Sequence, residues 1–407
     1  MSFDLISLPL NEIASFKYGK TIRKQDIEVV GTYPVHSGYT IVGYLPTYMY
    51  EDEQLLIVCR GAGGTGDIKL SPPQVSITNL AIVISCDESK VCKEYLYWVL
   101  KLADTYSLRT GSAQPQITIN SLDSFNVAIH QDLGVQKKIA TFLDKLNSKV
   151  NINTQTNHTL EQMAQAIFKS WFVDFEPVKA KMNGKQPEGM NAETASLFPE
   201  KLVESELGLI PEGWEVGALS SVVDVIMGQS PKGSTYNDQN EGTPLVNGPV
   251  EFGVYHPVAQ KWTTAPTKMS KNKDLIVCVR GSTTGRYVVS DGEYCLGRGV
   301  CSIRSNDFPS FANYLFKSEL NSLLHLTTGS TFPSWSGPTL KNFKVVVPPE
   351  TIIEKFELLV GKLCEMMARN TGQNETLSTL RDTLLPKLLS GEIDLGETNP
   401  ESIKEDV

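Results

Sequence analysis

Two stretches of the chain repeat apolar residues at the three- and four-residue spacing of an amphipathic helix. One stripe covers residues 135–171 and the other covers residues 353–388. Each predicts about 37 residues of helix, or roughly 55 Å at a rise of 1.5 Å per residue. Pro348-Pro349 favours the start of the second helix and Gly391 its end, whereas Pro386 predicts a kink before that end.

Both stripes have a polar middle with asparagines at matching places. Asn153 corresponds to Asn370, and Asn157 corresponds to Asn374. If the two helices pair in antiparallel directions, these polar middles meet. Asparagine in such a position fixes register and orientation at some cost in stability. The sequence leaves one alternative open, because Gly372 also permits a break into two shorter helices.

The segments that precede the stripes have a different pattern. Residues 1–132 and 214–348 contain short apolar runs rich in β-branched residues, separated by Gly, Pro, Ser and Asn, which predicts strands and turns. The predicted strands include Leu55–Cys59, Leu80–Ser85, Leu275–Val279 and Val345–Val347, and helices are predicted at Lys93–Tyr106 and Pro309–Leu324.

The two halves of the chain share short blocks in the same order. Matching blocks begin at Leu10 and Leu219, at Leu55 and Leu275, at Thr110 and Thr328, and at Asn157 and Asn374, with offsets of 209, 220, 218 and 217 residues. This order indicates a duplicated unit of one domain plus one helix. The offset grows between the first two blocks, so the second copy has a longer segment there.

We therefore predict an α+β protein with two β-rich domains separated by a pair of long antiparallel helices. The helices form a coiled coil, and an internal pseudo-twofold repeat relates the two halves. The predicted boundaries are 1–132 for the first domain, 133–173 for the first helix, 174–213 for a linker, 214–348 for the second domain, 349–391 for the second helix and 392–407 for a flexible acidic tail.

Charge is distributed unevenly along the chain. The net charge of −9 argues against a uniformly basic nucleic-acid-binding surface. Residues 349–407 carry 6 basic and 12 acidic groups, which supply −6 of that charge, whereas residues 214–348 carry 12 basic and 10 acidic groups. A local basic face in the domains is therefore compatible with the overall acidity.

Cysteine and histidine positions bear on redox state and metal binding. The seven cysteines form no C-x-x-C motif and lie mostly in apolar runs, which favours buried free thiols in an intracellular protein. The five histidines are scattered without metal-ligand spacing, so we predict no metal site. No apolar run reaches membrane-spanning length and the N-terminus lacks a secretory pattern, so we expect a soluble, cytoplasmic protein without membrane attachment.

Motifs for catalysis are incomplete. Gly61–Gly66 is similar to a phosphate-binding loop but lacks its Lys-Ser/Thr, and the matching Gly281–Gly285 lacks it too. No nucleophile elbow, zinc-protease motif or nuclease cluster is recognisable. We predict no catalytic residue, and a duplicated chain without visible chemistry favours a binding function over an enzyme with an unrecognised site.

Four segments make the chain resemble the specificity subunits of Type I restriction–modification systems along nearly its full length. They are Ile167–Glu176 and Leu380–Ile393 at the ends of the two helices, Pro211–Trp214 at the start of the second copy, and Val347–Glu350 before the second helix. The first copy departs from this pattern because it lacks the Gly-Trp opening. The resemblance implies two target recognition domains, each reading half of a split DNA site, with the helices as spacer.

The same resemblance implies partners and chemistry outside this chain. Two methyltransferase (modification) subunits would bind it and methylate adenines with S-adenosylmethionine, and motor–nuclease (restriction) subunits would add cleavage with ATP and magnesium. The chain itself would bind double-stranded DNA as a non-catalytic subunit without a cofactor of its own. A two-armed scaffold that binds protein ligands and does not read DNA is the alternative.

Loop residues suited to phosphates and base edges are the candidate DNA contacts. In the first copy they are Lys17, Lys20, Arg23, Lys24, Arg60, Thr65, Arg109, Ser112, Gln114 and Gln116. In the second copy they are Gln229, Ser230, Lys232, Tyr236, Arg280, Thr283, Thr284, Arg286, Ser330, Ser334 and Trp335. Arg60 and Arg280 carry most weight because both copies place an arginine directly after a buried strand, although a structural ion pair is the alternative. Thr110–Ser112 and Thr328–Ser330 also fit turns that hold the fold.

An aromatic cluster closes the first stripe. Phe168, Trp171, Phe172 and Phe175 recur at helical spacing. Amphipathic stripes normally face a core, which favours packing of these rings within the helix pair. A docking face for methyltransferase subunits is the alternative.

Overall fold

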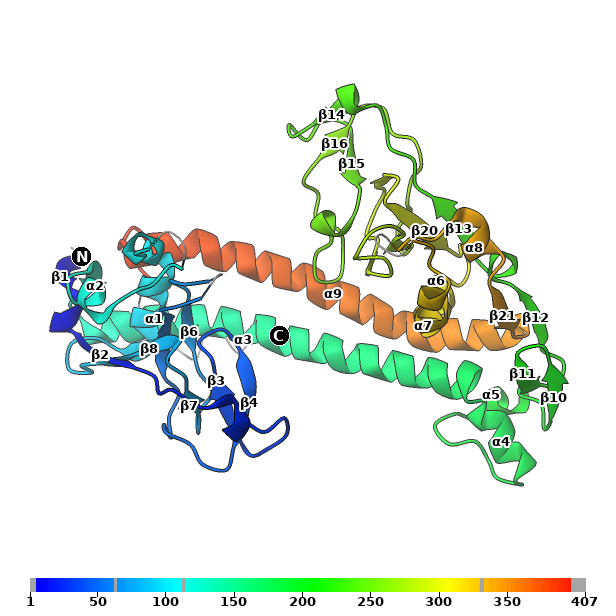
Figure 1. Cartoon of the computed structure of the whole chain (residues 1–407), viewed down its shortest axis with the longest axis horizontal. Helices are drawn as coiled ribbons and strands as arrows, with labels where there is room; N and C mark the ends of the chain where they lie inside the picture. The colour runs from blue at the N-terminus through cyan, green and yellow to red at the C-terminus, as the bar shows by residue number, and fades with distance from the viewer. Residues whose placement is uncertain (1–4, 62–63, 112–113, 330–332, 397–407) are drawn as a thin grey trace. The chain divides into compact units, whose positions relative to one another are not determined.

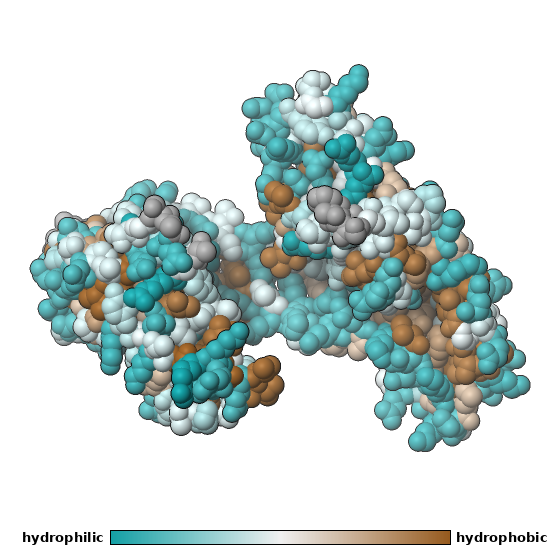
Figure 2. Space-filling model, in the orientation of Figure 1, coloured by the Kyte–Doolittle hydropathy of each residue, from teal (hydrophilic) through white to brown (hydrophobic). Residues whose placement is uncertain are grey.

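The structure is a computed structural model and describes residues 5–61, 64–111, 114–329 and 333–396 (Figure 1). The chain forms two compact units. Unit 1 comprises Met1–Asn151 and Asn374–Val407, and unit 2 comprises Ile152–Gln373. Ser112, Ser330 and most of the predicted acidic tail lie outside the described residues. In the view of Figure 2 hydrophilic residues dominate both units, with smaller hydrophobic groups among them.

Unit 1 is built around a four-stranded antiparallel sheet in the order β2-β8-β5-β6. Its inner strand β5 (Leu55–Val58) is completely buried, because an uninterrupted apolar run suits a strand covered on both faces. The other strands of this sheet are β2 (Ala14–Tyr18), β8 (Ala81–Cys86) and β6 (Ile68–Leu70). A second sheet, β4-β3-β7, and a β1–β9 pair complete the strands: β3 (Tyr33–His36), β4 (Ile41–Leu45), β7 (Ser76–Ile77), β1 (Leu5–Pro9) and β9 (Asn126–His130).

Helices cover the main sheet of unit 1. The short helices are α1 (Lys93–Leu102) and α2 (Ile119–Asp123). Two long helices, α3 (Leu133–Phe168) and α9 (Glu350–Leu389), each contribute one end to the same core. Ile139 and Leu143 of α3 and Leu385 and Leu388 of α9 are buried there together with Leu55 of the sheet. The first domain is therefore anchored on both long helices.

Unit 2 repeats this plan with its own sheet, β13-β20-β17-β18. Those strands are β13 (Asp224–Met227), β20 (Val300–Arg304), β17 (Leu275–Cys278) and β18 (Tyr287–Val289). A second sheet contains β14 (Tyr236–Asn237), β16 (Trp262–Thr263), β15 (Thr243–Val246) and β19 (Cys295–Leu296), and β12 (Glu215–Ala218) pairs with β21 (Lys344–Val347). The helices are α6 (Pro309–Ser318), α7 (Leu320–His325) and α8 (Gly337–Lys341), so the one helix predicted at Pro309–Leu324 is two.

The internal repeat is confirmed element by element. The main sheets have the same strand order, with β2, β8, β5 and β6 in the places of β13, β20, β17 and β18. The parallel pair β3–β7 corresponds to β15–β19, and β1–β9 corresponds to β12–β21. The longer segment predicted for the second copy lies between β13 and β17 and contains β14.

The segment predicted as a linker is structured. After a π-helical turn at Lys169–Val173 it contains α4 (Glu176–Met182), α5 (Ala192–Ser196) and a hairpin of β10 (Leu202–Ser205) and β11 (Gly208–Pro211). Phe198 and Ile210 are buried in the core of unit 2. Of the residues that suggested a linker, Gly184 and Gly189 lie in turns, whereas Pro177 lies in the first turn of α4 and Pro211 ends β11.

The aromatic cluster belongs to that same core. The rings of Phe168, Trp171, Phe172 and Phe175 are at most 8% exposed. Phe172 packs edge-on against Phe356 of α9, with ring centroids 5.2 Å apart. The alternative of a docking face is therefore wrong, because these rings are already covered within the chain.

The two long helices are continuous through their polar middles. The alternative of a break at Gly372 is therefore wrong, since Gly372 lies inside α9. Asn157 Nδ2 donates to the Met367 carbonyl at 3.0 Å, and Asn370 Nδ2 donates to Asn157 Oδ1 at 2.8 Å. Asn153 pairs with Gln373 at 2.8 Å, so residue numbers rise along α3 as they fall along α9. The helices are antiparallel, and their asparagines meet.

Candidate nucleic-acid interface

A pair of loops occupies the same place in both domains, and we call it the loop pair. In unit 1 it comprises residues 60–66 and 109–116, and in unit 2 residues 280–286 and 328–334, apart from the undescribed residues 62–63, 112–113 and 330–332. Arg60 forms a backbone bridge with Gln116, and Arg280 forms the same bridge with Ser334. The arginine after the buried strand is thus joined to the second loop in each copy.

The second loop of each pair is closed by reciprocal backbone hydrogen bonds. Thr110 and Gln116 exchange bonds of 2.8 and 2.9 Å, and Thr328 and Ser334 exchange two bonds of 3.0 Å. The suggestion that the Thr-Gly-Ser segments begin turns is therefore confirmed for their first residues.

Thr65 and Thr284 connect the two loops of each pair through their hydroxyl groups. Thr284 Oγ1 lies 2.8 Å from both the Gly281 and Pro333 carbonyls. Thr65 Oγ1 lies 3.0 Å from the Gly61 carbonyl and 3.5 Å from that of Pro115, and Thr65 is only 1% exposed. The prediction of direct contact is wrong for Thr65, which is buried, whereas it stays a prediction for the half-buried Thr284.

Trp335 is also a core residue. Its side chain is 2% exposed, and its Nε1 donates to the Leu323 carbonyl at 2.7 Å. The strand-like alternation after Ser334 turns the indole inward. Its prediction as a DNA contact is therefore wrong. Ser334 is half-buried and its hydroxyl faces Thr328, 3.5 Å away.

The loop-pair arginines of unit 1 rest on aromatic rings. The Arg60 guanidinium lies 5.6 Å from the ring centre of Tyr18, and that of Arg109 lies 4.1 Å from the ring centre of Tyr106. Arg109 Nε also donates to the Thr65 carbonyl at 2.5 Å. Neither arginine forms an ion pair with any described residue, so the structural alternative for Arg60 has no carboxylate partner there.

The other candidates of unit 1 are mostly exposed and therefore accessible to DNA: Lys17, Lys20, Lys24, Gln114 and Gln116. Arg23 differs from them because its Nε lies 2.9 Å from Asp26 Oδ2. A carboxylate beside the guanidinium weakens its attraction for phosphate. Arg23 is accordingly the weakest of the basic candidates in this loop.

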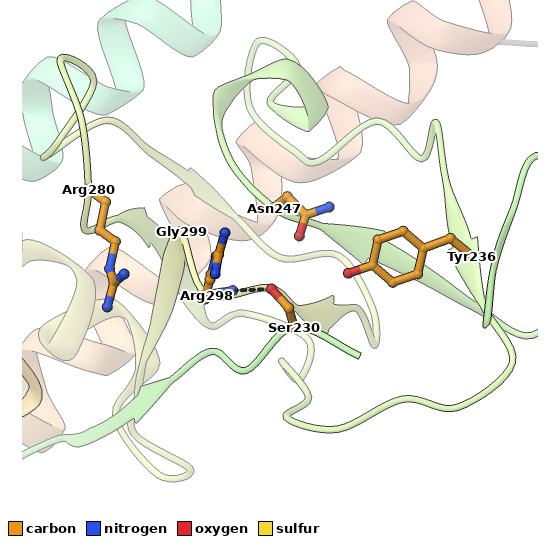
Figure 3. A pocket seen from close by; sticks show the side chains of 6 residues that line it. All are labelled: Ser230, Tyr236, Asn247, Arg280, Arg298 and Gly299. Atoms are coloured by element: carbon orange, nitrogen blue, oxygen red, sulfur yellow. Dashed lines mark hydrogen bonds between the residues drawn. The ribbon is translucent and has the colours of Figure 1, made fainter. Parts of the chain in front are cut away.

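Unit 2 has a pocket of about 600 Å³ that brings three predicted residues together. Ser230, Tyr236 and Arg280 line it, together with Asn247 and Arg298, which the sequence analysis missed. Figure 3 shows Tyr236 and Arg280 on opposite sides, with the other side chains between them. Neither arginine is ion-paired within the described chain, so the pocket concentrates positive charge beside neutral hydrogen-bonding groups.

A sequence signal for Arg298 existed. It stands between Gly297 and Gly299, directly before the buried strand β20. A charged residue between glycines before an apolar run suits a tight loop at the surface. Among the other candidates of unit 2, Gln229, Lys232 and Arg286 are exposed and Thr283 is half-buried.

The chemistry available elsewhere in the described residues is limited. All seven cysteines are unpaired, and burial raises the pKa of Cys59 and of Cys278 to about 11. Within the described ranges no three His, Cys, Asp or Glu side chains are placed to hold a metal ion. No helix in the part of the chain that the structure describes is long and apolar enough to cross a membrane.

Comparisons with known proteins agree with the duplicated architecture. The chain matches the family described as "Type I restriction modification DNA specificity domain" over residues 7–162 and 211–355, one match in each copy. It is 30% identical over 372 residues to the Type I restriction enzyme HindI specificity subunit of Haemophilus influenzae, covering 77% of this chain and 80% of that protein.

Two further similarities extend this comparison. The putative type I restriction enzyme MjaX specificity subunit of Methanocaldococcus jannaschii is 25% identical over 325 residues, covering 77% of this chain and 71% of that one. The crystal structure of the S subunit of a Type I restriction-modification system from M. genitalium has a TM-score of 0.64 at 15% identity, covering 95% of this chain and 96% of that one. That likeness concerns the fold.

Proposed function

This chain belongs to the Type I restriction–modification DNA specificity family, and we propose that its two recognition domains each read one half of a bipartite DNA site. The observation that carries the proposal is the loop pair. The same bridged loops recur in both domains with an arginine at the same place, and the residue bridged to that arginine differs, Gln116 in one domain and Ser334 in the other. A shared frame with different side chains suits two readers of different sequences.

The side chains around the loop pairs have the chemistry that DNA reading requires. Lysines and arginines neutralise phosphates, which positions a protein on the duplex. Arginine, glutamine and asparagine form paired hydrogen bonds with guanine or adenine in the major groove. Arg280, Arg298 and Asn247 surround one pocket, which favours base reading there.

We further propose that α3 and α9 set the spacing of the two half-sites. Each helix supplies residues to the cores of both units, with Ile139 and Phe168 at the two ends of α3 as the example. Helix α3 has 36 residues and therefore a length of roughly 54 Å. One turn of DNA measures about 34 Å, so such a helix is long enough to bridge it.

Catalysis would belong to partner subunits in this proposal. Methyltransferase subunits would bring S-adenosylmethionine and modify adenines, and motor–nuclease subunits would bring ATP and magnesium for cleavage. The chain would direct both activities without a catalytic residue or cofactor of its own. Its acidic excess lies in residues 349–407, which leaves the domains closer to neutrality.

The test is a methylation map. The chain is co-expressed with its methyltransferase partner in a host that lacks adenine methylation, and modified adenines are located by sequencing. We expect two half-sites separated by a fixed number of unspecified bases. A single continuous motif or no motif would contradict the proposal and favour the protein-binding scaffold. A complex with Lys344→Ala, which removes an exposed charge paired with Glu206 outside the pocket, should give the same methylation map as the wild-type chain.

A further inference from the structure

The two domains also share a loop arrangement directly before one inner strand of the main sheet, β8 in unit 1 and β20 in unit 2. In unit 2, the loop after β13 lies along the loop before β20: Gly228 N–H donates to the Val300 carbonyl at 3.0 Å and Gln229 N–H donates to that of Leu296 at 2.8 Å. The N–H of Arg298 then donates to Ser230 Oγ at 3.2 Å. Arg298 therefore stands two residues before β20, where the two loops meet.

Unit 1 has the same arrangement with a different side chain. Gly19 N–H donates to the Ala81 carbonyl at 3.0 Å, and Lys20 N–H donates to that of Ile77 at 2.9 Å. Asn79, two residues before β8, donates through Nδ2 to Thr21 Oγ1 at 3.2 Å. Asn79 and Arg298 thus occupy equivalent positions in the repeat.

The loop that carries Arg298 is held rigidly. A Cβ atom at Gly297 would lie 2.0 Å from Asn247 Oδ1, and one at Gly299 would lie 2.2 Å from the Asn247 carbonyl oxygen. Both glycines are therefore required by the close approach of Asn247. A backbone fixed on both sides of Arg298 limits where its side chain can reach, which favours a specific contact over a diffuse charge.

The guanidinium of Arg298 makes no hydrogen bond or ion pair with the described residues that would give it a structural role. Its backbone N–H, and not its guanidinium, makes the bond to Ser230. The residue is exposed, lines the pocket beside Arg280, and forms no ion pair with any described residue. At the equivalent position, Asn79 uses one amide hydrogen for Thr21, and its Oδ1 accepts no hydrogen bond from the described residues.

These two side chains match two different bases. A guanidinium donates two parallel hydrogen bonds to O6 and N7 of guanine, whereas a carboxamide accepts from N6 and donates to N7 of adenine. We propose that this position determines specificity in both domains: Arg298 reads a guanine in the second half-site, and Asn79 reads an adenine in the first. The inference rests on the proposed function, because it assigns bases within the half-sites proposed there.

The experiment compares methylation maps of complexes that contain the wild-type chain, Arg298→Ala, Arg298→Lys or Asn79→Ala. In Arg298→Ala we expect discrimination at one guanine of the second half-site to fall by roughly 10- to 100-fold. The first half-site should stay unchanged. Asn79→Ala should relax one adenine position of the first half-site only.

Arg298→Lys separates base reading from phosphate binding. Lysine keeps the charge and can still donate to guanine but lacks the planar fork, so discrimination by a guanine reader should fall, whereas a phosphate contact should leave discrimination unchanged. Full discrimination in Arg298→Lys, or a change confined to the wrong half-site, overturns the inference.

A variant that abolishes methylation is examined by competition binding to duplexes substituted at each position of the second half-site. Selective loss of discrimination at one guanine supports the inference, and uniform weakening across all duplexes overturns it. If the wild-type complex yields no bipartite motif, the proposed function itself has failed, which is a separate result.

Discussion

Two threonines stabilise the loop pairs through their hydroxyl groups. Thr65 and Thr284 occupy equivalent positions, and each hydroxyl bridges the carbonyls of two loops that are distant in sequence. In unit 2 the same two carbonyls also accept backbone N–H groups, so the Thr284 hydroxyl adds a second hydrogen bond to each of them. The threonines therefore stabilise the loop pairs that carry the candidate DNA contacts.

We predict that Thr284→Val lowers the free energy of unfolding by about 1 kcal/mol, because valine keeps the shape but removes the two hydroxyl hydrogen bonds to the carbonyls of Gly281 and Pro333. Each carbonyl keeps one backbone donor, the N–H of Thr284 for Gly281 and the N–H of Gly281 for Pro333, so the loss is moderate. DNA affinity should fall while the recognised sequence stays the same, since no base contact is removed. Urea unfolding and a methylation map measure the two effects. Thr264→Val, at an exposed threonine of the same unit, should change neither. A shifted motif in Thr284→Val would show that the hydroxyl reads a base.

The same residues mark the limit of prediction from sequence. The arginine after each buried strand was identifiable because the repeat places Arg60 and Arg280 at matching positions. Whether a neighbouring side chain faces solvent depends on loop pairing across roughly fifty residues, which no local pattern reveals. Thr65 and Trp335 were therefore predicted as contacts although both are buried.

At the scale of elements, a partly buried ion pair attaches α6 to α3 within unit 2. Glu161 Oε2 accepts from the Tyr314 hydroxyl at 2.7 Å, and Glu161 Oε1 accepts from Lys317 Nζ at 3.0 Å. Burial acts to raise the pKa of Glu161, but Lys317 and the hydrogen bonds outweigh it and hold the pKa below the ordinary value of 4.5. The ionised form is thus favoured in the folded chain.

The contribution of Glu161 to the free energy of unfolding should therefore depend on pH. A carboxyl group whose pKa is lowered by folding contributes stability above its unfolded pKa, and that contribution is lost as the pH falls through the folded value. We predict that Glu161→Gln destabilises the chain by about 1–2 kcal/mol at neutral pH, since the partly buried Lys317 is left without its partner. The difference from wild type should shrink below about pH 4.5. Urea unfolding at several pH values measures it, and Glu206→Gln, in an exposed pair, is the control.

The asparagines of the helix pair give a second prediction at this scale. Asn370→Leu leaves Asn157 Oδ1 without its donor, and should cost about 1–2 kcal/mol. The double variant Asn157→Leu with Asn370→Leu should cost less than the sum of the single changes, because both ends of the bond are removed together. A double-mutant cycle from urea unfolding measures this coupling. Strict additivity would show that the asparagines do not interact.

Helices and strands were predictable from sequence to different extents. The stripes of α3 and α9 were clear because apolar spacing persists over many turns. Residues 174–213 were predicted as a linker because their proline and glycine content outweighed a few scattered apolar residues. Phe198 and Ile210 find their partners only in the folded core of unit 2, so their role could not be read locally.

At the scale of the whole molecule, each unit combines segments that are far apart in sequence. The first domain is completed by the C-terminal end of α9, where Leu385, Leu388 and Leu389 join its core. His130 Nε2 also lies 3.2 Å from the Leu388 carbonyl. The duplication is evident from the sequence. The packing of the C-terminal end of α9 in the first domain is not, because it depends on the antiparallel pairing of α3 with α9.

This arrangement makes a prediction about domain exchange. Replacing residues 1–132 with the equivalent domain of a relative should change only the first half-site, since the second loop pair and its pocket lie wholly in unit 2. The chimera should also lose stability, because the foreign domain must pack on Leu385, Leu388 and Leu389 of this chain. A second chimera that also takes residues 374–396 from the relative should recover that stability and recognise the same site as the first. Methylation maps and thermal unfolding of both chimeras measure these outcomes, and a change in both half-sites would show that the two domains do not read DNA independently.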